Sequence, residues 1–129
     1  MLTIRIEGKP IAWSRPRPRR YGGFYSPHKE TGWYAQILLQ AKAFKPASPM
    51  DGPLRLSIEF LMPRPQARKK DTWHIVRPDR DNLEKLVSDA LKDAGWMRDD
   101  SQVCSGPVEK RYPKQGEMPG ALITLERIA

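Results

Sequence analysis

Residues 83–95 read LEKLVSDALKDAG, and the apolar side chains of this stretch recur at the spacing of an α-helix. They form one continuous stripe down a single side of the helix, made by Leu83, Leu86, Val87, Ala90, Leu91 and Ala94. Gly95 follows the last of them, at the position where a glycine commonly ends a helix. The stretch therefore predicts an amphipathic helix that packs one face against a core.

The segments on either side predict a sheet. Leu2, Ile4 and Ile6 alternate with polar residues, which is the period-two pattern of a half-buried strand. By similar patterns we expect a helix over residues 30–44, with Phe44 on its apolar side, and strands over residues 53–62, 102–112 (interrupted at Gly106-Pro107) and 121–128. The order β-α-β-α-β-β favours an α+β fold: one two-layer domain, residues 1–129, with its helices packed on a mainly antiparallel or mixed sheet.

The composition excludes several classes of protein. With 39% hydrophobic and 29% charged residues, the 129-residue chain matches ordinary globular domains rather than disordered or membrane proteins. It has no apolar run of about 18 residues and no secretory signal, so we expect a cytoplasmic protein that does not enter membranes. The single cysteine, Cys104, excludes an internal disulfide and a thiolate zinc site, and we expect it to be buried and inert.

The formal net charge of +8 favours nucleic acid as a partner. Basic residues gather in residues 13–28 and 63–78, which have no helical or strand periodicity and therefore predict loops. We expect these loops to hold the DNA backbone through Arg15, Arg17, Arg19, Arg20, Lys69, Lys70 and Arg77. Excess basic residues also serve solubility alone, so the placement of the acids carries more information.

The acids concentrate in residues 79–100, which hold seven acidic and four basic residues. This segment has a net charge of −3 inside a chain that is otherwise +11, so it would repel DNA unless a cation neutralised it. Asp79 and Asp81 are two apart in a segment that Pro78 is expected to hold extended, so both carboxylates can face one point. Asp100 can complete a three-carboxylate cluster if the strand after it runs back beside the helix start. Such a cluster suits Mg²⁺, with Mn²⁺ as a substitute, in phosphoryl transfer.

Ordinary structural roles also explain these residues. Acids at a helix N-terminus cap free N–H groups and interact favourably with the helix dipole. Lys85 lies one turn from both Asp81 and Asp89, where a solvated ion pair is expected. His28 and His74 fall in the two basic loops and fit loop residues better than catalytic bases.

Residues 78–103 together resemble the RusA family of Holliday junction resolvases. The shared pattern is D-x-D-N-L-x-K-x-x-x-D-A-L, starting at Asp79, followed by D-D-x-Q-V, starting at Asp99. This pattern is far more specific than any pair of acids. Three segments nearer the N-terminus are also similar to phage-type members: Gly8-Lys9-Pro10, Arg15-Pro16-Arg17 and Tyr25-Ser26-Pro27.

The resemblance implies a Mg²⁺-dependent endodeoxyribonuclease that resolves four-way DNA junctions in recombination and repair, acting as a homodimer that cuts two opposing strands. It implies metal-binding catalytic aspartates at Asp79, Asp81 and Asp100, and a catalytic role for Lys85 beside the scissile phosphate. Three further positions match the motif without a definite role: Asn82, Asp89 and Asp99. Arg80 departs from the family, which usually has an apolar residue between the two aspartates.

Two other functions fit the same residues. One is a nuclease for other branched or single-stranded DNA, and the other is a non-catalytic DNA-binding protein whose acids only cap a helix. The aspartate triad argues against the second. Paired nicks in a four-way junction, but not in a flap or a linear duplex, would separate the three.

Overall fold

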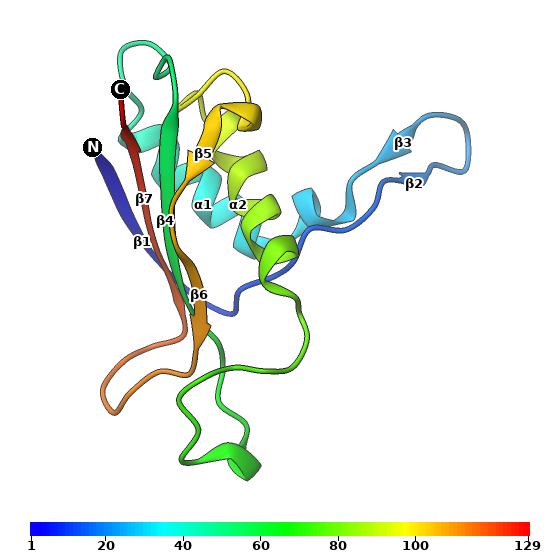
Figure 1. Cartoon of the computed structure of the whole chain (residues 1–129). Helices are drawn as coiled ribbons and strands as arrows, with labels where there is room; N and C mark the ends of the chain where they lie inside the picture. The colour runs from blue at the N-terminus through cyan, green and yellow to red at the C-terminus, as the bar shows by residue number, and fades with distance from the viewer.

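The alternating apolar residues form a five-stranded mixed sheet in a computed structural model that describes residues 1–129. β1 (Leu2–Glu7) pairs antiparallel with β7 (Gly120–Arg127), which pairs antiparallel with β4 (Leu54–Leu61). β5 (Val103–Ser105) and β6 (Val108–Arg111) follow each other along the other edge of β4 and run parallel to it. Figure 1 shows these strands as one twisted layer.

A break separates β5 from β6 at Gly106 and Pro107, as the sequence predicts. Gly106 has a φ of +125°, and a side chain there would lie 1.9 Å from the carbonyl oxygen of Leu56. Only glycine avoids this collision with β4. The Pro107 carbonyl then accepts a hydrogen bond from the N–H of Ile58 at 3.0 Å, and regular pairing resumes at Val108.

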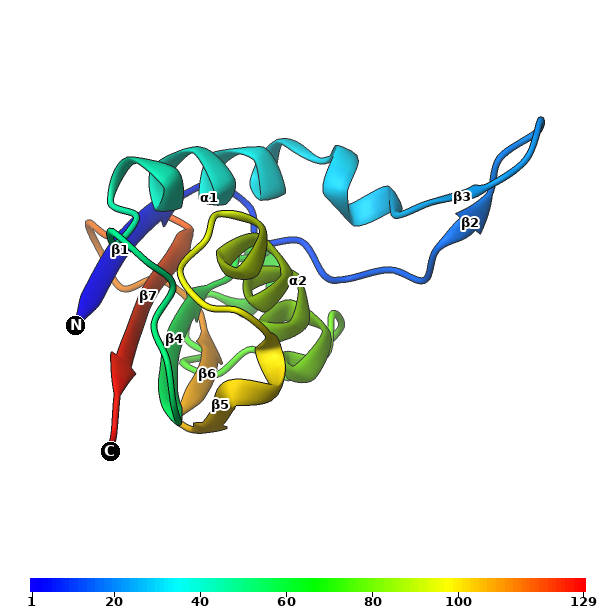
Figure 2. The same cartoon turned by 90° about the horizontal axis from the view of Figure 1, so that it is seen from above.

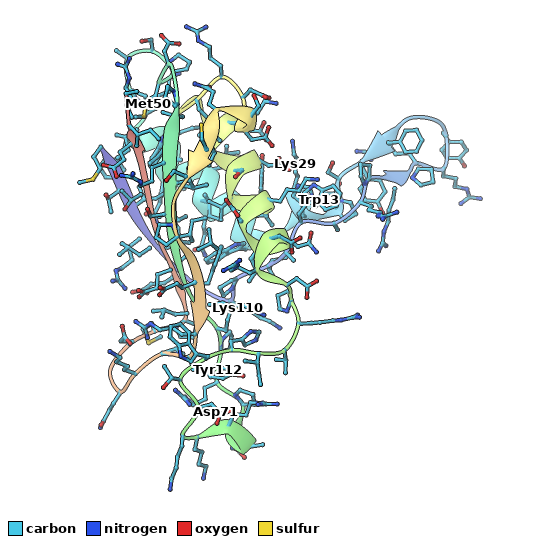
Figure 3. The ribbon with its side chains drawn as sticks, viewed as in Figure 1. Trp13, Lys29, Met50, Asp71, Lys110 and Tyr112 are labelled. Atoms are coloured by element: carbon cyan, nitrogen blue, oxygen red, sulfur yellow. The ribbon has the colours of Figure 1, made fainter.

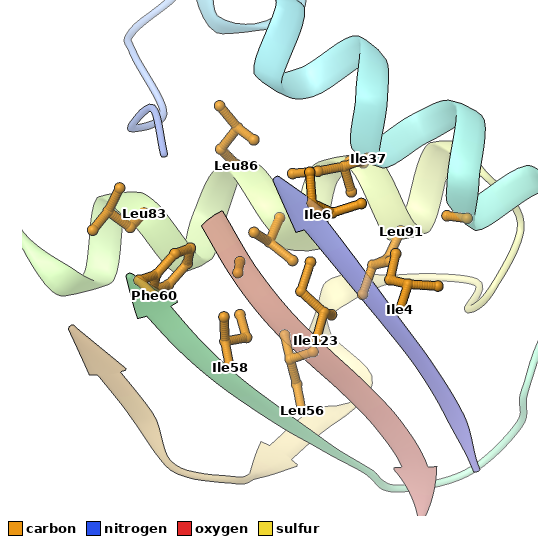
Figure 4. Close-up of a cluster of buried hydrophobic side chains, with 14 of the residues drawn as sticks. Ile4, Ile6, Ile37, Leu56, Ile58, Phe60, Leu83, Leu86, Leu91 and Ile123 are labelled. Atoms are coloured by element: carbon orange, nitrogen blue, oxygen red, sulfur yellow. The ribbon is translucent and has the colours of Figure 1, made fainter. Parts of the chain in front are cut away.

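Both helices cover the same face of the sheet (Figure 2), which confirms the predicted α+β fold. α2 (Arg80–Asp93) buries the whole stripe predicted from residues 83–94, and Gly95 adopts a φ of +87° just after the helix. α1 (Gly32–Ala43) begins after Thr31, whose Oγ1 accepts the N–H of Tyr34 at 3.2 Å. Figure 4 shows α2 and the strands enclosing one apolar core.

Three expectations about side chains and loops are wrong. Phe44 is 61% exposed, because α1 ends at Ala43 and the chain turns away before Phe44 can reach the core. Cys104 is exposed, because it faces outward from the short edge strand β5. Residues 13–28 are not a plain loop, since they contain a short hairpin of β2 (Arg17–Pro18) and β3 (Phe24–Tyr25) and a 3-10 turn, η1 (Pro27–Glu30).

The parallel pairing of β5 with β4 determines where the two ends of α2 lie. The chain leaves β4 at its C-terminal end and must return to the opposite edge of the sheet before a parallel strand can start. α2 makes this return, so its first turn lies near the end of β4 and its last turn lies near the beginning. At that last turn, the N–H of Met50 donates to the Trp96 carbonyl at 2.9 Å. Neither helix has both the length and the apolar composition that crossing a membrane requires.

Candidate functional site

The N-terminal end of α2 carries the first two predicted metal ligands. Asp79 is the N-cap residue, with φ −72° and ψ 148°, and its carboxylate makes no capping hydrogen bond. Asp81 lies in the first turn, where its Oδ1 accepts the N–H of Asn82 at 2.9 Å. Both side chains are exposed. The helix begins at Arg80, so the expectation that one extended segment carries both aspartates is wrong, and only Asp79 is extended.

An open cavity of about 440 Å³ lies at this end of the helix. Its lining residues are Arg77, Pro78, Asp79 and Asn82. The cavity is at the sheet edge where β4 ends, and in open α/β sheets ligands bind outside the carboxyl ends of the strands. The free N–H groups of the first helical turn favour an anion such as phosphate there.

Two basic side chains, one on β6 and one on α2, hold the segment that carries Asp79 next to β6. Lys110 Nζ donates to the carbonyls of Val76 at 2.6 Å and Pro78 at 2.8 Å. Burial lowers the pKa of Lys110, and the charge of Asp79 opposes this shift. Arg80 donates from Nη1 to the Val108 carbonyl at 3.2 Å, which gives a structural reason for a basic residue between the two aspartates. Figure 3 labels Lys110 beside β6.

Lys85 points from α2 toward the N-terminal segment of the chain. Its Nζ lies 3.7 Å from the centroid of the Trp13 ring, a cation–π geometry. The N–H of Trp13 donates to the Asn82 carbonyl at 2.8 Å, so this segment crosses α2 at its first turn. Lys85 has no ion pair with Asp81 or Asp89, contrary to the ordinary structural role considered for it. Figure 3 shows Trp13 on the side of α2 away from the sheet.

Asp89 holds a buried histidine. His28 is only 2% exposed, and its Nδ1 accepts the N–H of Ser14 at 3.4 Å. The other ring nitrogen, Nε2, therefore carries the proton and donates to Asp89 Oδ2 at 2.9 Å. His28 lies in η1 rather than in an open loop, and its contacts give Asp89 a structural role. His74 is also buried, next to the Tyr112 ring, and burial lowers its pKa.

Two adjacent aspartates with different surroundings lie just beyond the C-terminal end of α2. Asp99 caps the 3-10 turn η3 (Asp100–Gln102) by accepting the N–H of Ser101, and it pairs with Lys92 Nζ at 3.0 Å. Hydrogen bonds from Ser101 and Lys92 lower the pKa of Asp99 to about 2. The Gln102 side chain completes a capping box. The Asp100 side chain is exposed, and its carboxylate has no hydrogen-bond or ion-pair partner.

The contacts therefore separate the seven acids of residues 79–100 into those that have a partner side chain and those that have none. Asp89, Asp93 and Asp99 have basic, histidine or tyrosine partners, and Asp93 pairs with Lys29 at 3.0 Å. Glu84 is partly buried, and burial raises its pKa, which disfavours the charged form that a cation needs. The three exposed acids without a partner side chain are the three predicted metal ligands: Asp79, Asp81 and Asp100.

Within one chain, these three carboxylates do not form the cluster that the sequence suggested. No group of three or more His, Cys, Asp or Glu side chains is placed to hold a metal ion. Asp79 and Asp81 lie at the start of α2, whereas Asp100 lies beyond its end, and a helix of 14 residues is about 20 Å long. The expectation required the strand after Asp100 to return to the helix start, but β5 is parallel to β4 and begins at the opposite sheet edge.

Asp79 and Asp81 fit the part of a Mg²⁺ site that a protein usually supplies. This ion takes oxygen ligands and is commonly held by one or two carboxylates, with water and substrate phosphate completing the shell. Cysteine and histidine are absent from residues 75–103, so softer ligands do not compete. The two carboxylates also make no ion pair that would have to break first.

The predicted DNA-binding residues lie on two exposed segments. Arg15, Arg17, Arg19 and Arg20 belong to the β2–β3 hairpin and its approach. Lys69 and Lys70 follow the 3-10 turn η2 (Gln66–Arg68), and Arg77 lines the cavity beside Asp79. Two further residues of the site, Trp13 and Lys110, were not predicted from the sequence. They lie 72 and 25 residues from Lys85 along the chain and carry no local signal for contact with α2.

Comparisons with known proteins agree with the motif. A search among curated proteins found no match. The protein-family profile described as "Endodeoxyribonuclease RusA" matches residues 7–126, nearly the whole chain. The chain therefore belongs to the RusA family of endodeoxyribonucleases, hydrolases that resolve Holliday junctions.

Proposed function

We propose that this protein resolves Holliday junctions in recombination and repair with Mg²⁺ bound at Asp79 and Asp81. The observation that carries the proposal is the exposure of both carboxylates, without a partner side chain, at the carboxyl edge of β4. In a chain with a net charge of +8, acids left free of ion pairs are suited to a cation. A Mg²⁺ ion bound there would lower the pKa of an attacking water and neutralise charge on the phosphate.

The remaining residues of this end of α2 position the DNA strand. The first-turn N–H groups and Arg77 favour a phosphate in the cavity beside Asp79. Lys85 supplies a positive charge one helical turn from Asp81, and the Trp13 ring restricts the position of its ammonium group. We assign Lys85 the stabilisation of the negative charge that develops on the scissile phosphate.

Asp100 requires a second copy of the chain if it is to join this site. A homodimer with a two-fold axis across α2 would place the last turn of one helix beside the first turn of the other. The Asp100 carboxylate of one protomer then approaches Asp79 and Asp81 of its partner. This arrangement accounts for an exposed acid without a partner at the far end of the helix, and it gives two sites for paired cuts.

The two exposed basic segments bind the DNA duplexes that meet at the junction. Arg15, Arg17, Arg19 and Arg20 are exposed together on the β2–β3 hairpin, and Lys69, Lys70 and Arg77 are exposed on the segment before α2. These basic side chains suit contacts with DNA phosphates, which add affinity but do not depend on the base sequence. Replacing Arg15 and Arg17 by Ala should weaken junction binding and flatten its salt dependence, as measured by gel shift at several salt concentrations.

The test is cleavage of end-labelled DNA by the purified protein. A synthetic four-way junction, a flap and a linear duplex are each incubated with Mg²⁺, with Mn²⁺ and with EDTA. We expect paired nicks in opposing strands of the junction with either metal and none in EDTA. Equal cleavage of the flap would indicate a general branched-DNA nuclease, and binding without cleavage under all conditions would contradict the proposal.

A further inference from the structure

The β2–β3 hairpin and the residues leading into it form an arm that projects from the body, as both views show (Figures 1 and 2). We define the arm as residues 15–25. All of its residues except Tyr25 are exposed. From Gly8 to Lys29 the chain has six Lys and Arg residues and no Asp or Glu, so the arm and its base are uniformly positive.

The tip of the arm exposes two aromatic rings that the fold leaves uncovered. Tyr21 is 91% exposed and Phe24 is 72% exposed. They flank Gly22 and Gly23, whose φ values of +103° and +75° make the turn tight, and the Arg19 N–H donates to the Gly23 carbonyl at 2.9 Å. A two-stranded ribbon of this size is at best marginally stable in water by itself. The rings and the ribbon therefore point to a surface that covers them in the working complex.

The positive charge of the arm indicates the chemistry of the surface that covers it. The Arg20 guanidinium lies 5.6 Å from the centre of the Tyr21 ring, and the Arg19 guanidinium lies 5.1 Å from the centre of the Tyr25 ring. Arginines next to exposed aromatic rings are a combination that binds nucleic acid strands, because the cations contact phosphates while the rings stack on bases. The arm carries no acidic residue, so contacts with DNA phosphates would offset its charge along its whole length.

The base of the arm fixes where its tip can reach. The Trp13 N–H binds the carbonyl of Asn82 in the first turn of α2. The eight residues from Trp13 to Tyr21 span at most about 26 to 29 Å when extended. This span is an upper limit on the distance from the first turn of α2 to the tip. A DNA duplex bound at Asp79 can be longer than this limit, so it can also contact the tip.

We propose that the arm recognises the branch of the junction by stacking Tyr21 and Phe24 on bases that the branch point leaves unstacked. This inference rests on the proposed function, because it assumes that branched DNA is the substrate. Apolar rings gain little from phosphates, and in a continuous duplex the base faces are covered by their neighbours. A branch point exposes base faces, so the rings add affinity for junctions that linear duplex does not receive.

The experiment measures binding in EDTA, where no DNA is cut, so its result does not depend on catalysis. Tyr21→Ala with Phe24→Ala is compared with the wild type, and Phe44→Ala is the control, since Phe44 is also exposed, at 61%, but lies at the end of α1. We expect the double variant to lose roughly a hundredfold in affinity for a four-way junction, about tenfold for each of the two stacked bases. Affinity for linear duplex should change little, and Phe44→Ala should behave as wild type.

A fluorescent base separates stacking from other effects. A junction carrying 2-aminopurine beside the branch point should change its emission when wild-type protein binds, and the double variant should leave the emission unchanged at saturating protein. Combined with Tyr21→Ala, Phe24→Trp should keep a signal and Phe24→Leu should not, because leucine keeps an apolar side chain without a ring. An equal loss of junction and duplex affinity would overturn the proposal. So would a double variant that becomes monomeric by light scattering while keeping its junction preference, since that result assigns the arm to a second copy. Junction cleavage by the wild type tests the proposed function separately.

Discussion

The two ends of α2 carry acids that the fold treats differently. At the last turn and just beyond it, Asp93 and Asp99 are paired with basic side chains, and Asp99 also caps a 3-10 turn, while only Asp100 has no partner side chain. At the first turn, Asp79 and Asp81 are exposed and have no partner side chain. An acid whose charge is already offset stabilises the protein, whereas an exposed acid without a partner is available to bind a cation. The density of acids along the chain does not reveal this division, but their partners do.

The strongest test of this comparison is the loss of a free acid at the first turn. Replacing Asp79 or Asp81 by Asn keeps the side-chain volume and removes a charge from the proposed metal site. We expect junction cleavage in Mg²⁺ to fall by at least about two orders of magnitude. Gel-shift affinity in EDTA should stay level or rise, because one charge that repels phosphate is gone. Asn is a good N-cap, so full activity in a folded Asp79→Asn protein would favour the helix-cap interpretation.

A mixing experiment tests whether the two ends of α2 meet across a dimer. Inactive Asp79→Asn and Asp100→Asn proteins are combined and allowed to exchange subunits. If each site takes residues from both protomers, a heterodimer has one intact site, and about a quarter of the sites in an equal mixture recover nicking. A mixture of Asp79→Asn with Asp81→Asn is the matched control and should stay inactive. Absence of nicking in the first mixture, with subunit exchange verified, would remove the shared site.

A smaller effect is expected from the residue that holds the loop before α2. Lys110→Met keeps most of the side-chain length but leaves the carbonyls of Val76 and Pro78 without their donor. The position of Asp79 should become less defined, and we expect cleavage to fall roughly tenfold, as for small misplacements of catalytic groups. Lys114→Met, at an exposed position in another loop, is the control. Equal activity in both variants would show that Lys110 does not position the site.

The smallest effect distinguishes the neighbours Asp99 and Asp100 by stability. Asp99→Ala removes the cap and the pair with Lys92 and should lower Tm by roughly a few degrees at neutral pH, whereas Asp100→Ala should leave Tm unchanged. The pKa of Asp99 is lowered to about 2 from an ordinary value of 3.8. Its stabilisation is therefore complete above about pH 4 and is lost as the pH falls toward 2. The Tm difference between wild type and Asp99→Ala should narrow over that interval, and a constant difference would contradict this assignment.

The sequence predicts well those features that depend on local pattern. The stripe from Leu83 to Ala94 and the alternation in Ile4, Ile6 and residues 54–60 each identify one element and its buried side, and the structure confirms them. Gly22-Gly23 is a recognisable hairpin signal, yet residues 13–28 were predicted to be a plain loop. The predictions that failed or were missed depend on contacts between distant residues. The position of Asp100 follows from the direction of β5, and the role of Asp89 follows from His28, which lies 61 residues away.

The two chain segments that flank the arm are both anchored to α2, so the arm has a defined position relative to this helix. The entering strand is held where Trp13 binds the Asn82 carbonyl, and the leaving strand is held where His28 binds Asp89, about two turns further along α2. The helix that carries Asp79 and Asp81 at its start is thus also the reference from which the arm extends. On the proposed function, the arm and the cut strand share one reference, so shortening the arm would move the bound branch relative to Asp79 and Asp81.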